Sequence, residues 1–140
     1  MLKSYNKLTV LPLILTAGFM LSGCNVESAP TAWQKTMSGT EGKYQALLHC
    51  NTTPQPGEFQ QCQISFSSMQ KEAALLHSIQ MEGGMPGHGH GLPTSPILSL
   101  QEAGTYQIDG LKYNMPGNWL LGFQVNGELG EDRIIFHLTI

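Results

Sequence analysis

Residues 119–140, WLLGFQVNGELGEDRIIFHLTI, are the stretch that decides the fold of this chain. Apolar residues alternate with others in two runs, which are Trp119, Leu121, Phe123 and Val125, and then Ile134, Phe136, Leu138 and Ile140. A period of two places these side chains on one face of a β-strand. The segment GELGED at 127–132 between the runs is typical of a turn. The pattern therefore predicts a β-hairpin with one apolar face.

Five further strands are predicted before this hairpin. The two clearest have alternating apolar residues at Ala46, Leu48 and Cys50, and at Cys62, Ile64 and Phe66. The other three lie at 75–81, 97–100 and 105–108. Glycine and proline separate the runs, and no segment has a convincing helical period. Seven short strands predict an all-β domain at 44–140, for which an immunoglobulin-like β-sandwich is favoured and a closed β-barrel is the main alternative.

The N-terminal segment has the features of a bacterial lipoprotein signal peptide. Two lysines precede an apolar run at 8–21, which is short for a membrane-spanning helix. The run ends in Leu-Ser-Gly-Cys at 21–24, where small residues admit a peptidase and the cysteine accepts diacylglycerol in lipoproteins generally. An ordinary transmembrane anchor is the alternative, but a proline and a glycine interrupt the run. We therefore expect residues 1–23 to be removed and Cys24 to carry lipid.

Residues 24–43 are expected to tether the domain to the lipid. The stretch after Cys24 is rich in Ser, Thr, Gly and Ala and has little apolar periodicity, which is typical of a flexible linker. Trp33 is the exception, and we expect it to dock on the domain rather than to lie at the lipid interface. The expected location is the cell envelope. Asn25 after the lipidated cysteine favours the outer membrane, facing the periplasm, if the cell has one.

The charge of the exported part excludes one class of partner. Without Lys3 and Lys7, five of the seven basic residues remain against ten acidic ones, and they form no basic cluster. Nucleic acid is therefore not an expected partner. The membrane, reached through the N-terminal lipid, is an expected one.

Cys50 and Cys62 are predicted to form a disulfide. Once Cys24 carries lipid, they are the remaining two of the three cysteines, and an exported chain meets oxidising conditions. Both cysteines also lie on the apolar faces of their predicted strands. Two reduced thiols that hold a metal are the alternative, although neither cysteine belongs to a CxxC pair.

The segment MEGGMPGHGHGLP at 81–93 is the part of the sequence that most suggests chemistry. In an extended backbone, residues two apart point the same way, so His88 and His90 are predicted to present both imidazoles to one ion. Met85 would add a thioether. Imidazole and thioether together suit copper, and Cu(I) above all, whereas Ca²⁺ and Mg²⁺ prefer oxygen ligands. The alternative is a solvated glycine-rich loop that binds nothing.

Two more methionines are candidate ligands, and each also fits the core. Met81 continues a strand alternation, which favours the core. Met115 also follows an alternating pattern, yet Met-Pro-Gly at 115–117 repeats Met-Pro-Gly at 85–87. The repeat predicts that two loops converge at one end of the domain. The remaining histidines fall within predicted strands and are interpreted as structural or surface residues: His49, His77 and His137.

Two motifs resemble known families. Met-Pro-Gly-His-Gly-His-Gly at 85–91, followed by Tyr-x-Met-Pro-Gly-x-Trp at 113–119, is similar to the YtkA-like and FixH-like families, and the resemblance covers about 44–140. It implies an immunoglobulin-like extracytoplasmic domain in families associated with copper handling. For FixH it implies assembly of a copper-containing terminal oxidase. The expected lipid anchor departs from the FixH group, which has a transmembrane helix there.

Two hypotheses about function follow. In the first, a membrane-anchored lipoprotein binds or delivers copper through His88, His90 and Met85, with Met81 or Met115 as further soft ligands and an envelope cuproprotein as partner. In the second, the domain is a non-metal interaction module that binds an envelope partner through a sheet face or edge. An enzyme is not expected, because the sequence has no GxSxG, HExxH or phosphate-loop motif and no free cysteine nucleophile.

Overall fold

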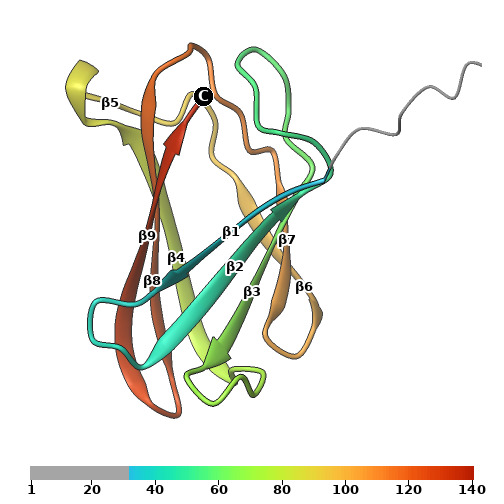
Figure 1. Ribbon diagram of the computed structural model, residues 1–140, viewed down its shortest axis with the longest axis vertical. Helices are drawn as coiled ribbons and strands as arrows, with labels where there is room; N and C mark the ends of the chain where they lie inside the picture. Colours follow the sequence, from blue (N-terminus) through green and yellow to red (C-terminus); the bar gives the residue numbers. More distant parts are fainter. Residues whose placement is uncertain (1–31) are drawn as a thin grey trace, which may run out of the picture.

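Strands with one apolar face pack into two antiparallel sheets in the computed structural model, which describes residues 32–140 (Figure 1). The five-stranded sheet has the order β1-β2-β3-β7-β6, with bounds Trp33–Ser38, Tyr44–Cys50, Cys62–Ser68, Thr105–Asp109 and Ile97–Glu102. The four-stranded sheet has the order β5-β4-β8-β9, with bounds His90–Gly91, Leu76–Met85, Asn118–Gly127 and Gly130–Thr139. A short 3-10 helix, η1, spans Pro86–His88. The predicted all-β sandwich is confirmed, and the barrel alternative is wrong.

The hairpin predicted at 119–140 consists of β8 and β9, which pair along their whole length. Their inward side chains are almost completely buried: Trp119, Leu121, Phe123, Val125, Ile134, Phe136 and Leu138. The turn is tighter than the one expected at 127–132, because only Glu128 and Leu129 separate the two strands. Gly130 has a φ of 89°, a conformation that glycine adopts without steric cost. The chain therefore enters β9 directly from the turn.

Part of the segment expected to be a tether, 24–43, is a strand of the domain. Residues 33–38 form the edge strand β1, which pairs with β2 along its whole length. Trp33 and Met37 are half-buried and pack against the core, so the expected docking of Trp33 is confirmed. The sequence pattern misses β1 because Lys35 occupies the inward position between them. The expected signal peptide and the lipid on Cys24 fall within 1–31, outside the described residues.

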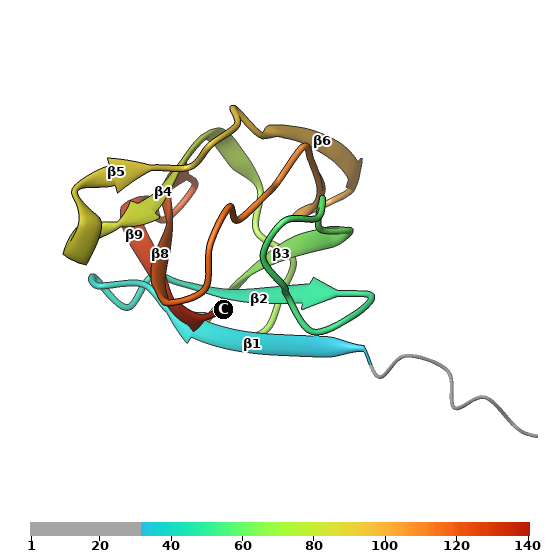
Figure 2. The ribbon, with the colours of Figure 1, turned by 90° about the horizontal axis from the view of Figure 1, so that it is seen from above.

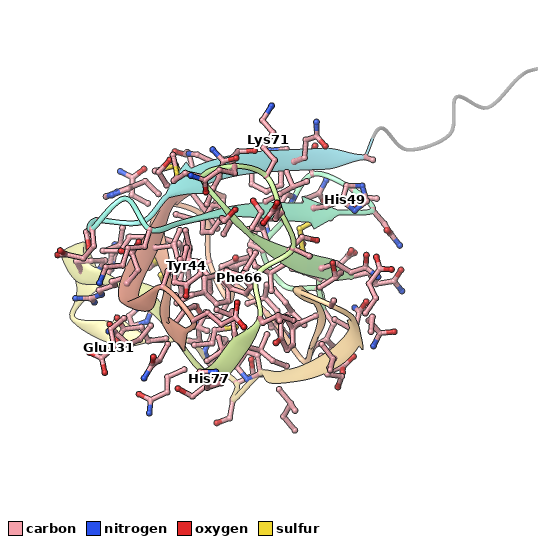
Figure 3. All side chains as sticks on the ribbon, turned by 90° about the horizontal axis from the view of Figure 1, so that it is seen from below. Tyr44, His49, Phe66, Lys71, His77 and Glu131 are labelled. Atoms are coloured by element: carbon pink, nitrogen blue, oxygen red, sulfur yellow. A yellow bond between two sulfur atoms is a disulfide. The ribbon has the colours of Figure 1, made fainter. Side chains whose placement is uncertain are left out.

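The disulfide ties β2 to β3 inside the core. Cys50 and Cys62 lie directly opposite each other in the register, and both are 1% exposed. Their sulfur atoms are 2.05 Å apart, so the predicted disulfide is confirmed and the metal-binding thiol pair is wrong. Phe66 joins the two sheets through an edge-on contact with Phe123, with ring centroids 5.6 Å apart. Figure 3 shows Tyr44 and Phe66 lying between the sheets, while Lys71 and Glu131 lie at the periphery.

Asp132 is a buried carboxylate beside the turn that connects β1 to β2. It is 2% exposed and accepts hydrogen bonds from four backbone N–H groups at 2.8 to 3.2 Å. The donors are Glu41, Lys43, Tyr44 and Arg133. Burial by itself raises the pKa of this carboxyl, but the four donors outweigh it and hold the pKa below its usual value. Asp132 therefore anchors the turn as an anion.

The two sheets are also linked at one edge. Figure 2 shows β1 passing beside the end of β9, where the Lys35 ammonium donates a hydrogen bond to the carbonyl of His137. Figure 1 places η1, β5 and the C-terminus at the same end of the sandwich, at the top of the view. Within the described part of the chain, no helix is long and apolar enough to cross a membrane.

Candidate metal site

The candidate site forms where β4 ends and the chain turns back on itself. η1 follows Met85 directly, and β5 then pairs with the end of β4, with Met85 opposite His90 and Gly84 opposite Gly91. Two glycines permit this return. Gly89 has a φ of 67°, and a Cβ on Gly84 would lie 2.5 Å from the carbonyl oxygen of His90. The turn therefore places Met85 and His90 side by side on one face of the sheet.

His90 presents one ring nitrogen that has no partner. Its Nδ1 lies 2.9 Å from the carbonyl oxygen of Gly91. A carbonyl can only accept, so Nδ1 is the donor, and in the neutral ring the lone pair is then on Nε2. Nε2 is buried, and within residues 32–140 it has no hydrogen-bond partner. A neutral imidazole whose Nδ1–H is bound to the backbone is the form that ligates a metal through Nε2.

Trp119 packs against the ring of His90. Its indole is completely buried, and its ring centroid lies 5.6 Å from that of His90 and 5.1 Å from that of Tyr113. The indole Nε1 donates a hydrogen bond of 3.1 Å to the carbonyl of Met115, which ties the second Met-Pro-Gly loop to β8. The Tyr113 hydroxyl is buried without a partner among the described residues, and burial raises the pKa of Tyr113. These aromatic contacts give the site an apolar wall.

His88 approaches His90 through a turn rather than along a strand. The extended backbone expected across the two histidines is wrong, because His88 ends η1 and Gly89 follows in the left-handed region. The two imidazole rings nevertheless have centroids 6.0 Å apart. Two imidazoles that bind one ion at about 2 Å place their centroids roughly 5 to 6 Å apart. The ring separation is therefore compatible with both imidazoles binding one ion, and the exposed His88 side chain is free to rotate.

The three candidate methionines differ in their relation to His90. Met85, which is 3% exposed, is its cross-strand neighbour, and a Cβ on Gly117 would lie 2.6 Å from the terminal methyl of Met85. The two Met-Pro-Gly loops therefore meet, as the repeat predicts. Met115 is half-buried and lies near His90. Met81 packs against the core four residues before Met85, about 13 Å away along β4, and the structure does not bring it to the site.

No family model, curated protein or solved structure matches this chain. The resemblance to the YtkA-like and FixH-like families stays a prediction. Which ion the site could bind is therefore argued from its side chains alone. In residues 32–140, no three side chains of His, Cys, Asp or Glu are grouped so that they could hold one ion. A metal site at His88 and His90 therefore requires a thioether to be complete.

A hollow beside the loop is lined by a histidine that the sequence pattern did not single out. This hollow of about 650 Å³ is lined by His88 and His137, with Met85 and Trp119 also on its wall. His137 faces outward from β9, because its neighbours on both sides are buried. Alternation along β9 predicts that outward direction. It does not predict the proximity to η1, which depends on how β4, β8 and β9 pair.

A smaller hollow of about 280 Å³ lies beside the candidate site. Met85 and His90 line it together with residues from the outer face of the four-stranded sheet. Glu82 and Arg133 form an exposed ion pair on the same lining. The hollow lies on the outer side of the sheet, whereas the His90 Nε2 is buried on the inner side.

Proposed function

We propose that this chain is a copper-binding lipoprotein whose domain holds Cu(I) through the Nε2 of His90, the thioether of Met85 and the imidazole of His88. The observation that carries the proposal is the buried, unpartnered Nε2 of His90 beside Met85. A buried polar atom without a partner is costly, and a bound ion would remove that cost. Imidazole and thioether are both ligands that suit Cu(I).

Burial of the ligands favours Cu(I) over a divalent ion. The cost of moving an ion out of water rises with its charge, so a monovalent ion is the easier one to hold beside Met85 and Trp119. Met115, near His90, offers a second thioether. Zn²⁺ is disfavoured, because it prefers histidine, cysteine and carboxylate ligands, and no such group of three is present in the described residues.

The wider setting follows from the same proposal. We propose an immunoglobulin-like domain of the YtkA-like and FixH-like kind, anchored by lipid on Cys24 in the cell envelope, at the outer membrane and facing the periplasm in a Gram-negative cell. Copper is its cargo and an envelope cuproprotein is its partner. Mass spectrometry of the membrane-extracted protein tests the anchor, and a mature chain that retains residues 1–23 would contradict it.

A non-metal interaction module is the second candidate function. It is favoured by the edge strand β6, where Ile97 is 66% and Leu100 is 64% exposed. Edge strands offer unpaired backbone groups to an incoming strand, and exposed apolar side chains add affinity. In that case the histidine loop would be only a connection, and copper would bind no more tightly than at any surface histidine.

Titration of the purified protein with Cu(I) against a competing chelator tests the proposal. We expect one Cu(I) per chain, with affinity reduced about tenfold or more in His90→Ala and Met85→Leu. Leucine is close to methionine in volume, so Met85→Leu removes the sulfur while preserving packing. His77→Ala is the matched control, because His77 is exposed elsewhere on β4 (Figure 3). No tight binding by the unaltered protein, or equal binding by all variants, would reject the copper site.

A further inference from the structure

The larger hollow brings together two histidines from distant parts of the sequence. His88 comes from the end of η1 and His137 from β9, and Asn118 and Thr139 also line the hollow. Both histidines are exposed, so an ion can reach them from solvent. His137 lies on the outer face of the four-stranded sheet, whereas His90 packs against the buried Trp119 on the inner face.

The position of His137 is fixed by its surroundings. Its backbone pairs with that of Leu120, two pairs in from the end of the β8–β9 ladder. The Lys35 ammonium donates a hydrogen bond to the His137 carbonyl and so holds the same residue from the side of β1. The backbone at His137 is therefore already ordered, so an ion that binds there needs to order only the exposed imidazole.

His88 is placed between two alternative partners. Its ring centroid lies 6.0 Å from that of His90, and it shares the hollow with His137. The three histidines do not form a single group that could hold one ion within the described residues. An ion held by His88 with His90 and an ion held by His88 with His137 would therefore occupy two different positions.

We infer that His88 and His137 form an outer copper position from which His88 passes the ion to the inner ligands His90 and Met85. This inference rests on the proposed function, because it supplies the route by which copper reaches that site. Two imidazoles accept either oxidation state of copper, and the polar side chains in the hollow add oxygen ligands. Transfer is an exchange of ligands in which His137 leaves as His90 and Met85 bind. The ion keeps its charge and no electron moves.

The inner and outer positions differ in the ion that they retain. The inner position contains a thioether and is expected to keep Cu(I). The outer position offers nitrogen and oxygen ligands, which suit the tetragonal geometry of Cu(II). Cu(II) is therefore a probe that reports the outer position, while Cu(I) reports the inner one.

Four histidine variants of the purified protein separate these positions: His137→Ala, His90→Ala, His88→Ala and the control His77→Ala. The readouts are the number of imidazole nitrogens on bound Cu(II) by electron paramagnetic resonance, the Cu(I) affinity, and the rate of Cu(I) association. In His137→Ala we expect Cu(II) to lose one of two nitrogens and Cu(I) association to slow about tenfold, with the final Cu(I) affinity unchanged. In His90→Ala we expect the two nitrogens on Cu(II) to remain and the Cu(I) affinity to fall. In His88→Ala we expect Cu(II) to lose a nitrogen and the Cu(I) affinity to fall as well.

The outcomes distinguish this inference from the function on which it rests. If His137→Ala behaves like His77→Ala in all three measurements, the outer position is wrong, and loss of Cu(I) in His90→Ala would still support the inner site. If the unaltered protein fails to bind Cu(I) tightly, the proposed function and the transfer both fail. Circular dichroism of each variant checks that the sandwich is retained. His137 and His88 are exposed, so their replacement is expected to leave stability within about 0.5 kcal/mol.

Discussion

Replacing Asp132 by alanine should strongly destabilise the sandwich, although the residue lies far from the candidate metal site along β9. The carboxylate accepts hydrogen bonds from four backbone N–H groups and is 2% exposed. Alanine leaves all four donors without their acceptor. It also leaves a space beside Gly39, where the backbone approaches the carboxylate so closely that a Cβ would overlap it.

The magnitude follows from the number and exposure of the donors. A hydrogen bond to a charged acceptor contributes about 1.5 to 3 kcal/mol. The contributions within one network do not add, and water can reach the donors near the turn. We therefore take the loss of stability to equal that of two such bonds rather than four. We therefore expect a loss of about 4 kcal/mol, out of a total stability of roughly 5 to 15 kcal/mol. In a domain of this size that lowers Tm by about 15 °C or more.

The effect should depend on pH in one direction. The pKa of Asp132 is lowered in the folded protein, so its carboxylate stabilises the fold fully above the unfolded pKa of about 4. That stabilisation is lost as the pH falls through the folded pKa. Thermal unfolding at pH 7 and at successively lower pH should show the difference in Tm between Asp132→Ala and the unaltered protein shrinking below about pH 4.

The control for this measurement is Asp109→Asn. Asp109 is exposed and accepts a hydrogen bond from the Ser99 hydroxyl, so its replacement should change stability by less than about 0.5 kcal/mol. If Asp132→Ala unfolds within about 2 °C of the unaltered protein at neutral pH, the four backbone hydrogen bonds do not hold the turn and the reasoning is refuted. A difference in Tm that does not change with pH would instead assign the effect to packing.

Three further predictions concern other parts of the fold. Gly39→Ala should lower Tm because its Cβ would displace the Asp132 carboxylate, and in the Asp132→Ala background the same change should cost little; full additivity in thermal unfolding would contradict this. The Cys50→Ala, Cys62→Ala double variant should lose about 3 kcal/mol in urea unfolding and become insensitive to reductant, and an unchanged urea midpoint would contradict this. Gly84→Ala should detach β5, because its Cβ would lie 2.5 Å from the His90 carbonyl oxygen. Faster amide hydrogen exchange in β5 and weaker Cu(I) binding would show this, and protection equal to that of the unaltered protein would count against it.

Much of the fold could be predicted because the two sides of each central strand differ in composition. In β2, β3, β8 and β9, most of the inward residues are apolar and buried, so the period of two is visible in the sequence. β1 was missed because an edge strand needs only partial burial, and Lys35 interrupts its inward row. β5 was missed because two residues, His90 and Gly91, are too few to show a period.

The candidate site could be predicted in its composition but not in its geometry. His88, His90 and Met85 are close in sequence, so any compact turn brings them near one another. The backbone of that turn was predicted incorrectly, since Gly89 adopts a left-handed conformation that the sequence permits without requiring. His137 lies 49 positions after His88 in the numbering, and only the pairing of β4, β8 and β9 places it nearby. Long-range pairing of this kind leaves no local signal.

The contact between His90 and Trp119 gives the domain an internal optical reporter. Trp119 is completely buried and its ring lies 5.6 Å from that of His90, so copper bound at Nε2 would be close enough to quench its fluorescence. Trp33 is the other tryptophan, and it lies half-buried on β1 in the opposite sheet. Its emission contributes to the same spectrum. Loading and release of the ion can then be followed in real time, without a label and at the low concentrations that a tight site requires.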